Sequence, residues 1–101
     1  MTVSLRNAPA FTDVFRALSD PMRWTIVCEM ARVPELACTT IEQLLPISKP
    51  TISYHIKVLF HAGLIDVRKQ GRNYFYALRR EALGEVLKLI GDEVNLSLEP
   101  V

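Results

Sequence analysis

The residues with the clearest chemical potential lie between positions 49 and 57, where hydrogen-bond donors and one aromatic ring occur without a carboxylate. The polar positions of this segment are Lys49, Thr51, Ser53, Tyr54 and Lys57. No Asp or Glu occurs from position 49 to position 65. Side chains of these types can donate to phosphate oxygens and base edges, so we predict contact with the major groove of DNA. An ordinary amphipathic surface helix would give the same local pattern, and the flanking segments must decide.

The same segment has the features of a helix with both ends specified. Ser48 can accept a hydrogen bond from an amide of the first turn, and Pro50 is tolerated only in that turn. Gly63 can adopt the left-handed conformation that ends a helix. The opposite face is hydrophobic at spacings of four and three, through Ile52, Ile56 and Leu59.

A short helix directly before this segment completes a helix-turn-helix. We predict that it begins near Thr39 or Thr40, because each has a capping-box partner three residues later. Its buried face consists of Ile41, Leu44 and Leu45. Two helices joined so closely, the second of them capped and basic, are typical of this DNA-binding unit.

After Gly63 the hydrophobic pattern changes from a helical period to an alternating one. Residues 64–69 and 72–78 are rich in β-branched and aromatic types and predict two strands, with Gln70-Gly71 as the turn. Three cations crowd the tip, namely Arg68, Lys69 and Arg72. A basic hairpin directly after the DNA-contacting helix is expected to act as a wing that reaches the DNA backbone or minor groove.

Hydrophobic faces on the first and last helices predict a dimer. The first helix is expected from about Phe11 to Leu18, and the last to about Leu96, with no later element to cover its hydrophobic face. A second copy is the simplest cover for both faces, especially as 50% of the residues are hydrophobic. The predicted dimerisation residues are Phe11, Val14, Phe15, Leu83, Val86, Leu87, Ile90 and Val94.

Between these helices, Asp20 and Pro21 predict the start of another helix that runs to about Arg32, with Trp24 in the core. The length predicts a single domain over residues 11–98, preceded by a flexible N-terminal arm over residues 1–10.

The net charge is only +1, but its distribution along the chain is uneven. Residues 49–80 hold seven basic residues against one acidic residue, a net charge of +6, whereas residues 1–48 have −1 and residues 81–101 have −4. This basic middle predicts a directed electrostatic contact with DNA. The chain has two cysteines outside a CxxC pattern and no signal-like or membrane-spanning run, so we expect a cytoplasmic protein.

From Phe11 to Ile90 the chain resembles the ArsR family of bacterial winged-helix repressors. The resemblance is carried by residues 15–23 (FRALSDPMR), 48–59 (SKPTISYHIKVL) and 62–65 (AGLI). It implies a mainly α winged helix-turn-helix with a small β-hairpin, in the order α-α-α-α-β-β-α. It further implies a homodimer through the terminal helices that binds an inverted-repeat operator and represses transcription until an inducer weakens DNA binding.

Many members of that family sense metals, and here the sequence departs from them. The cysteine positions of the family's third helix fall on Ala37 and Thr39, with Cys38 between them, and no His occurs after Arg79. One thiol or a set of carboxylates makes a poor transition-metal site. We therefore expect no metal site and no cofactor, while the inducer stays unknown.

Several other residues and functions are weighed against this interpretation. His55 is expected to be structural, His61 exposed and Cys28 part of the core, while Cys38 is either inert or redox-active. Phe60 either packs under the wing or marks an exposed patch for a partner or ligand. A winged-helix module that binds protein through Phe60 and residues 74–76 is the alternative function. An enzyme is not expected, because no clustered nucleophile and base or phosphate-binding loop occurs.

Overall fold

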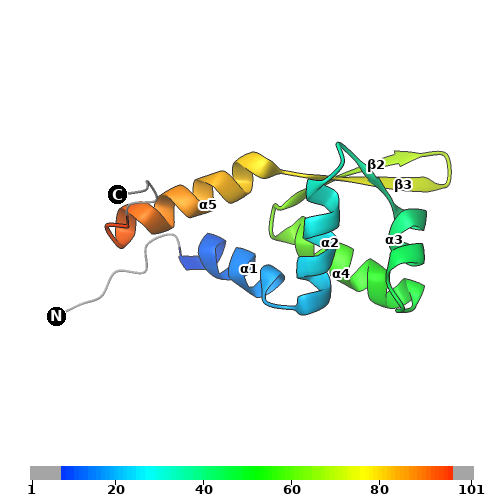
Figure 1. Cartoon of the computed structure of the whole chain (residues 1–101), viewed down its shortest axis with the longest axis horizontal. Helices are drawn as coiled ribbons and strands as arrows, with labels where there is room; N and C mark the ends of the chain where they lie inside the picture. The colour runs from blue at the N-terminus through cyan, green and yellow to red at the C-terminus, as the bar shows by residue number, and fades with distance from the viewer. Residues whose placement is uncertain (1–7, 97–101) are drawn as a thin grey trace.

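The structure is a computed structural model that describes the backbone of residues 8–96 and the side chains of residues 12–96. Its helices are α1 (Ala8–Leu18), α2 (Pro21–Ala31), α3 (Cys38–Leu44), α4 (Lys49–His61) and α5 (Arg80–Glu93). Its strands are β1 (Leu36–Ala37), β2 (Ile65–Gln70) and β3 (Asn73–Leu78). Figure 1 shows α1 and α5 at one end of the molecule, α3 and the β2–β3 hairpin at the other, and α2 and α4 between them.

Helix starts follow the expected local signals in α2 and α4. Asp20 caps α2 by accepting hydrogen bonds from the amides of Met22 (2.8 Å) and Arg23 (3.1 Å). The Ser48 hydroxyl accepts from the amide of Thr51 at 3.4 Å, and Gly63 follows α4 with a φ of 75°. Helix α1 begins at Ala8, earlier than predicted, because Pro9 is compatible with a first helical turn.

The predicted capping box of α3 is wrong. The helix begins at Cys38, with Ala37 as an N-cap that forms no side-chain hydrogen bond. Strand β1 explains this start, because Ala37 pairs with Phe75 of β3 and so fixes the chain up to the residue before the helix. The sequence did not reveal β1, since two residues are too few to show an alternating pattern.

The three strands form an antiparallel sheet in the order β1-β3-β2, with Tyr76 of β3 opposite both Leu36 and Val67. Gln70 pairs with Asn73, so the hairpin loop is Gly71-Arg72 rather than Gln70-Gly71 as predicted. Gly71 has a φ of 63°. A two-residue loop with positive φ at its first position fits the right-handed twist of the paired strands.

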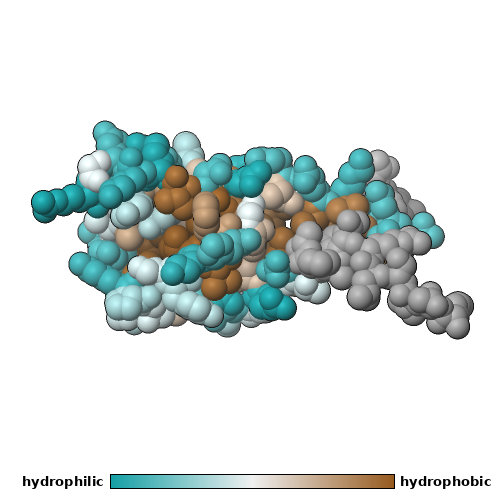
Figure 2. All heavy atoms as spheres, turned by 180° about the vertical axis from the view of Figure 1, so that it is seen from behind, coloured by the Kyte–Doolittle hydropathy of each residue, from teal (hydrophilic) through white to brown (hydrophobic). Residues whose placement is uncertain are grey.

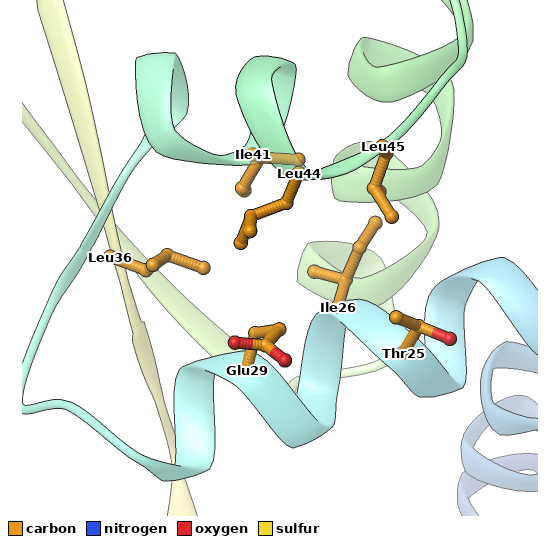
Figure 3. A pocket seen from close by; sticks show the side chains of 7 residues that line it. All are labelled: Thr25, Ile26, Glu29, Leu36, Ile41, Leu44 and Leu45. Atoms are coloured by element: carbon orange, nitrogen blue, oxygen red, sulfur yellow. The ribbon is translucent and has the colours of Figure 1, made fainter.

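The core lies where α2, α3, α4 and the sheet meet. Its largest fully buried side chains are Ile26, Met30, Ile41, Ile52, Leu59, Leu64 and Ile65. Figure 3 shows Ile41 of α3 and Leu45, the residue after that helix, facing Ile26 of α2. The void between them is about 10 Å³, at most the size of one water molecule. Close packing therefore fixes α3 against α2, and α4 packs against both.

Trp24 does not belong to this core, contrary to the prediction. It is 52% exposed, because the inward face of α2 is occupied by Arg23, Ile26, Val27 and Met30 at helical spacing. Trp24 instead borders a hydrophobic surface beside α5.

Candidate nucleic-acid interface

Helix α4 presents its polar residues to solvent and its hydrophobic residues to the core. Lys49, Thr51, Ser53, Tyr54 and Lys57 are all exposed, whereas Ile52, His55, Ile56 and Leu59 are buried. The predicted division of this helix into two faces is therefore confirmed. Within the described residues, neither of its lysines forms an ion pair, so both ammonium groups are available to an external anion.

A buried pair of side chains fixes the orientation of α4. The Nη1 of Arg23 lies 3.2 Å from the Nδ1 of His55, and both side chains are more than nine-tenths buried. A guanidinium has no acceptor, so Nδ1 must accept this hydrogen bond and the neutral ring carries its proton on Nε2. His55 is thus the structural histidine expected from its position.

Arg23 also joins α4 to the end of α1. Its Nε donates to the carbonyl of Ala17 at 2.7 Å, and its Nη2 donates to the carbonyl of Arg16 at 3.2 Å. Those carbonyls belong to the last turn of α1, where carbonyl groups lack the regular helical donor, and that of Arg16 also accepts from the amide and hydroxyl of Ser19. Sequence reasoning did not single out Arg23. The available signal was a lone cation on the same helical face as Ile26, Val27 and Met30.

The three cations predicted on the wing differ in their contacts with other side chains. Arg68 donates from Nε and Nη2 to Glu35 and from Nη1 to Gln70, and its guanidinium lies 4.4 Å from the centroid of the Phe75 ring. The ion pair raises the pKa of Arg68 and lowers that of Glu35. Lys69 and Arg72 are exposed and form no ion pair within the described part of the chain.

Helices α1 and α5 border a third functional surface, here called the terminal-helix hollow, whose lining is hydrophobic. Phe15 (49%), Trp24 (52%) and Leu87 (57%) are exposed there, and no residue of α5 is fully buried. Of the predicted dimerisation residues, those that line this hollow are Val14, Phe15, Leu83, Val86, Leu87 and Ile90. Val14 is 5% exposed and lies at its base, while Val94 is exposed outside it. The Phe11 side chain falls outside the described residues.

The other candidate residues lie at the end of α4 or are partly buried cysteines. His61 is exposed at the end of α4, and Phe60 beside it is 50% exposed, so the wing does not cover Phe60. Both cysteines are free and partly buried, and the Cys38 thiol donates to Glu42 at 3.8 Å. Tyr76 packs against Cys38, and burial is the main reason that its pKa is raised.

The part of the chain that the structure describes has neither a cluster of metal-ligand side chains nor a helix suited to a membrane. Residues 8–96 contain no group of three or more His, Cys, Asp and Glu side chains arranged to hold a metal ion. Over the same part of the chain, none of the helices has the length and hydrophobicity that crossing a membrane requires.

Comparison with known proteins decides the family. Residues 8–68 match a family described as a helix-turn-helix domain. The arsenical resistance operon repressor of Staphylococcus xylosus is 34% identical over 84 residues, which cover 83% of this chain and 79% of that protein. An ArsR-like transcriptional regulator from Rhodococcus sp. RHA1 has 30% identity and a TM-score of 0.75, covering 88% of this chain and 86% of that one. The chain belongs to the ArsR family.

Other relatives agree with this assignment. An uncharacterized helix-turn-helix transcriptional regulator of Methanocaldococcus jannaschii is 31% identical over 80 residues, which cover 79% of this chain and 90% of that protein. The ArsR-family protein described here is therefore a DNA-binding transcriptional regulator with a winged helix-turn-helix fold, as the sequence predicted. Its relatives are regulators of transcription, a class that is not normally enzymatic.

Proposed function

We propose that this ArsR-family protein is a homodimeric repressor that acts in the cytoplasm by binding an inverted repeat in double-stranded DNA. The observation that carries the proposal is the exposed face of α4, where lysines and hydroxyl groups stand without any carboxylate. Repression is the activity named for the Staphylococcus xylosus relative.

In this proposal α4 lies in the major groove. Thr51, Ser53, Tyr54 and Lys57 would contact or approach base edges, and Lys49 at the start of the helix would contact a phosphate. The Arg23–His55 contact supports this role, because it holds the buried side of α4 and so fixes which residues face outward.

The wing would contact the DNA beside α4 through Lys69 and Arg72, whose charges are not paired within the described part of the chain. Such contacts go to phosphates and add affinity that does not depend on sequence. Arg68 would add to the positive potential while its hydrogen bonds to Glu35 hold the wing against the segment before β1.

The terminal-helix hollow supports the dimer. Its exposed side chains, including Phe15 and Leu87, form a hydrophobic surface of the kind that monomeric proteins rarely leave in water. Covering it with the same surface of a second copy gives a two-fold axis, and two α4 helices can then bind two half-sites. One neighbour of similar fold, from Mycobacterium bovis, is described as a homodimeric winged helix-turn-helix domain (24% identity, TM-score 0.69).

The name of the Staphylococcus xylosus relative refers to arsenical resistance, and we do not propose arsenic sensing for this chain. Cys38 is flanked by Ala37 and Thr39, so a pair of neighbouring thiols is absent at that position. A soft ion such as arsenic(III) requires more than one thiolate for tight binding.

Selection of duplexes from a random pool, followed by fluorescence anisotropy on the selected sequence, tests the proposal. If the dimer makes roughly six to ten phosphate contacts, affinity should fall by about 10³ to 10⁵ between 50 and 200 mM salt. Lys57→Ala should weaken binding, whereas Lys88→Ala on α5 should leave it unchanged. Selection of no preferred sequence, together with binding insensitive to salt, would contradict the proposal.

A further inference from the structure

A second hydrophobic surface, here called the α4–wing hollow, lies between α4 and the wing. Phe60 (50% exposed), Val67 (40%) and Tyr74 (40%) line its open part, with Ile56 and Tyr76 more deeply buried. Figure 2 views the molecule from behind, where hydrophobic residues gather in the middle of the face between hydrophilic surroundings. The hollow is open to solvent on one side and has a volume of about 550 Å³, enough to hold part of a small molecule.

The proposed dimer does not cover this hollow. Helices α1 and α5 lie at the opposite end of the molecule from α3 and the hairpin (Figure 1), and none of the residues that line the terminal-helix hollow lines the α4–wing hollow. DNA would cover the edge of the hollow that Ser53 and Lys57 form, but its charged backbone gains nothing from half-exposed Phe60 and Val67 in the rest of it. Hydrophobic side chains in a concave surface are better matched by an apolar ligand.

The charges around the hollow restrict that ligand further. Lys57 and His61, one helical turn apart on α4, line it, and no Asp or Glu is among its described lining residues. Lys69 adds a third donor nearby, with its Nζ 5.5 Å from the centroid of the Tyr74 ring. This arrangement complements an anion attached to a hydrophobic group.

Aromatic side chains line the hollow from both sides, with Phe60 on α4 and Tyr74 on β3. Aromatic rings prefer offset-stacked or edge-to-face contacts with other rings. An aromatic ligand can make such contacts with either side chain, whereas an aliphatic group cannot.

We propose that the α4–wing hollow binds a planar aromatic carboxylate, with the ring between Phe60 and Tyr74 and the carboxylate against Lys57 and His61, and that binding lowers the affinity for DNA. The effect on DNA rests on the proposed function, because the ligand would occupy Lys57 and cover the edge of the hollow that would face DNA. Linkage requires that DNA lower the affinity for the ligand by the same factor.

Two matched probes test the binding site directly. 2-Naphthoate carries the carboxylate, and 2-naphthamide has the same ring without the charge. In methyl NMR titrations, 2-naphthoate should shift the signals of Ile56 and Val67 in a saturable manner and bind more tightly than 2-naphthamide. No saturation at millimolar concentration, equal affinity for the two probes, or shifts confined to Leu87 at the other end would overturn the proposal.

Substitutions of single residues test which side chains contact the ligand. Phe60→Ser should weaken 2-naphthoate binding by about tenfold or more through lost ring contact, while Leu89→Ser, a matched change of an exposed side chain on α5, should leave it unchanged. Lys57→Met should weaken 2-naphthoate binding and leave 2-naphthamide binding unaltered. A Phe60→Ser protein that binds 2-naphthoate as the unaltered protein does would overturn the proposal, and the probe comparison above stands even if that variant fails to fold.

Anisotropy on the selected duplex then separates the two proposals. Adding 2-naphthoate should weaken DNA binding by the unaltered protein, and Phe60→Ser should need about tenfold or more of it for the same effect. If the ligand-free protein binds no DNA, the proposed function is wrong, but the NMR titration still shows whether the α4–wing hollow binds 2-naphthoate. If DNA binding is intact and 2-naphthoate binds without weakening it, the regulatory half of the proposal is wrong.

Discussion

Arg68 of the wing donates two hydrogen bonds to the carboxylate of Glu35, at 2.9 Å from Nε to Oε2 and 2.6 Å from Nη2 to Oε1. Glu35 directly precedes β1, so this bidentate contact ties the wing to the segment that follows α2. The fork of a guanidinium matches a carboxylate in geometry, which makes the contact directional as well as electrostatic. Arg68 therefore helps to hold the wing in place and is less available to DNA than Lys69 and Arg72.

Glu35→Gln should strengthen DNA binding. The substitution removes a negative charge beside the wing and releases Arg68 to contact a phosphate, so the slope of log affinity against log salt should steepen by about one. Anisotropy titrations at several salt concentrations measure both quantities. Glu85→Gln, a carboxylate on exposed α5, serves as the control and should change neither. An unchanged slope in Glu35→Gln would show that Arg68 already contacts DNA fully in the unaltered protein.

Asp20 should make the stability of the protein depend on acid pH. Hydrogen bonds from the backbone amides of Arg23 and Met22 lower the pKa of Asp20 below its usual 3.8. A carboxyl group whose pKa is lower in the folded state stabilises that state above the unfolded pKa, and this contribution is lost as pH falls through the folded value. Asp20→Asn, which keeps a capping side chain, should therefore lose less stability between pH 5 and pH 3 in urea titrations. Parallel curves for the two proteins would contradict this.

Arg23→Leu should destabilise the fold and disturb α4. The change leaves the carbonyl of Ala17 and the Nδ1 of His55 without the donor that Arg23 supplies, at a cost of about 3 kcal/mol in the free energy of unfolding. Urea denaturation measures that cost. Nitrogen-15 NMR of the unaltered protein should show the neutral His55 ring protonated on Nε2, and this preference should weaken in Arg23→Leu. A proton on Nδ1 in the unaltered protein would disprove the assigned contact.

Leu87→Glu should separate the proposed dimer. Leu87 is 57% exposed in the terminal-helix hollow, so a carboxylate there would be placed against the same surface of the second copy. Sedimentation should show a monomer, and affinity for the inverted repeat should fall by about a hundredfold or more, because the two half-sites are then bound independently. Lys88→Glu changes the next residue on the helix, outside the hollow, and should remain dimeric. A Leu87→Glu protein that stays dimeric would place the interface elsewhere.

Several features of this protein follow from local signals that the amino-acid sequence displays directly. Asp20, Ser48 and Gly63 mark helix ends through hydrogen bonds and backbone conformations that involve only near neighbours. The spacing of Ile52, Ile56 and Leu59 likewise determined which face of α4 is buried, and hence that Lys57 and Tyr54 point outward. The resemblance to the ArsR family rested on the same segments, and the comparisons confirmed it.

Tertiary structure alone decided the features that depend on contacts between distant segments. Strand β1 exists because Leu36 and Ala37 meet β3, and that pairing moves the start of α3 away from the predicted cap. The contact of Arg68 with Glu35 joins residues 33 positions apart, and that of Arg23 with His55 joins residues 32 apart. The position of Trp24 outside the core was decided in the same way. No local pattern encodes such contacts, because they depend on how the packed helices and strands place side chains in space.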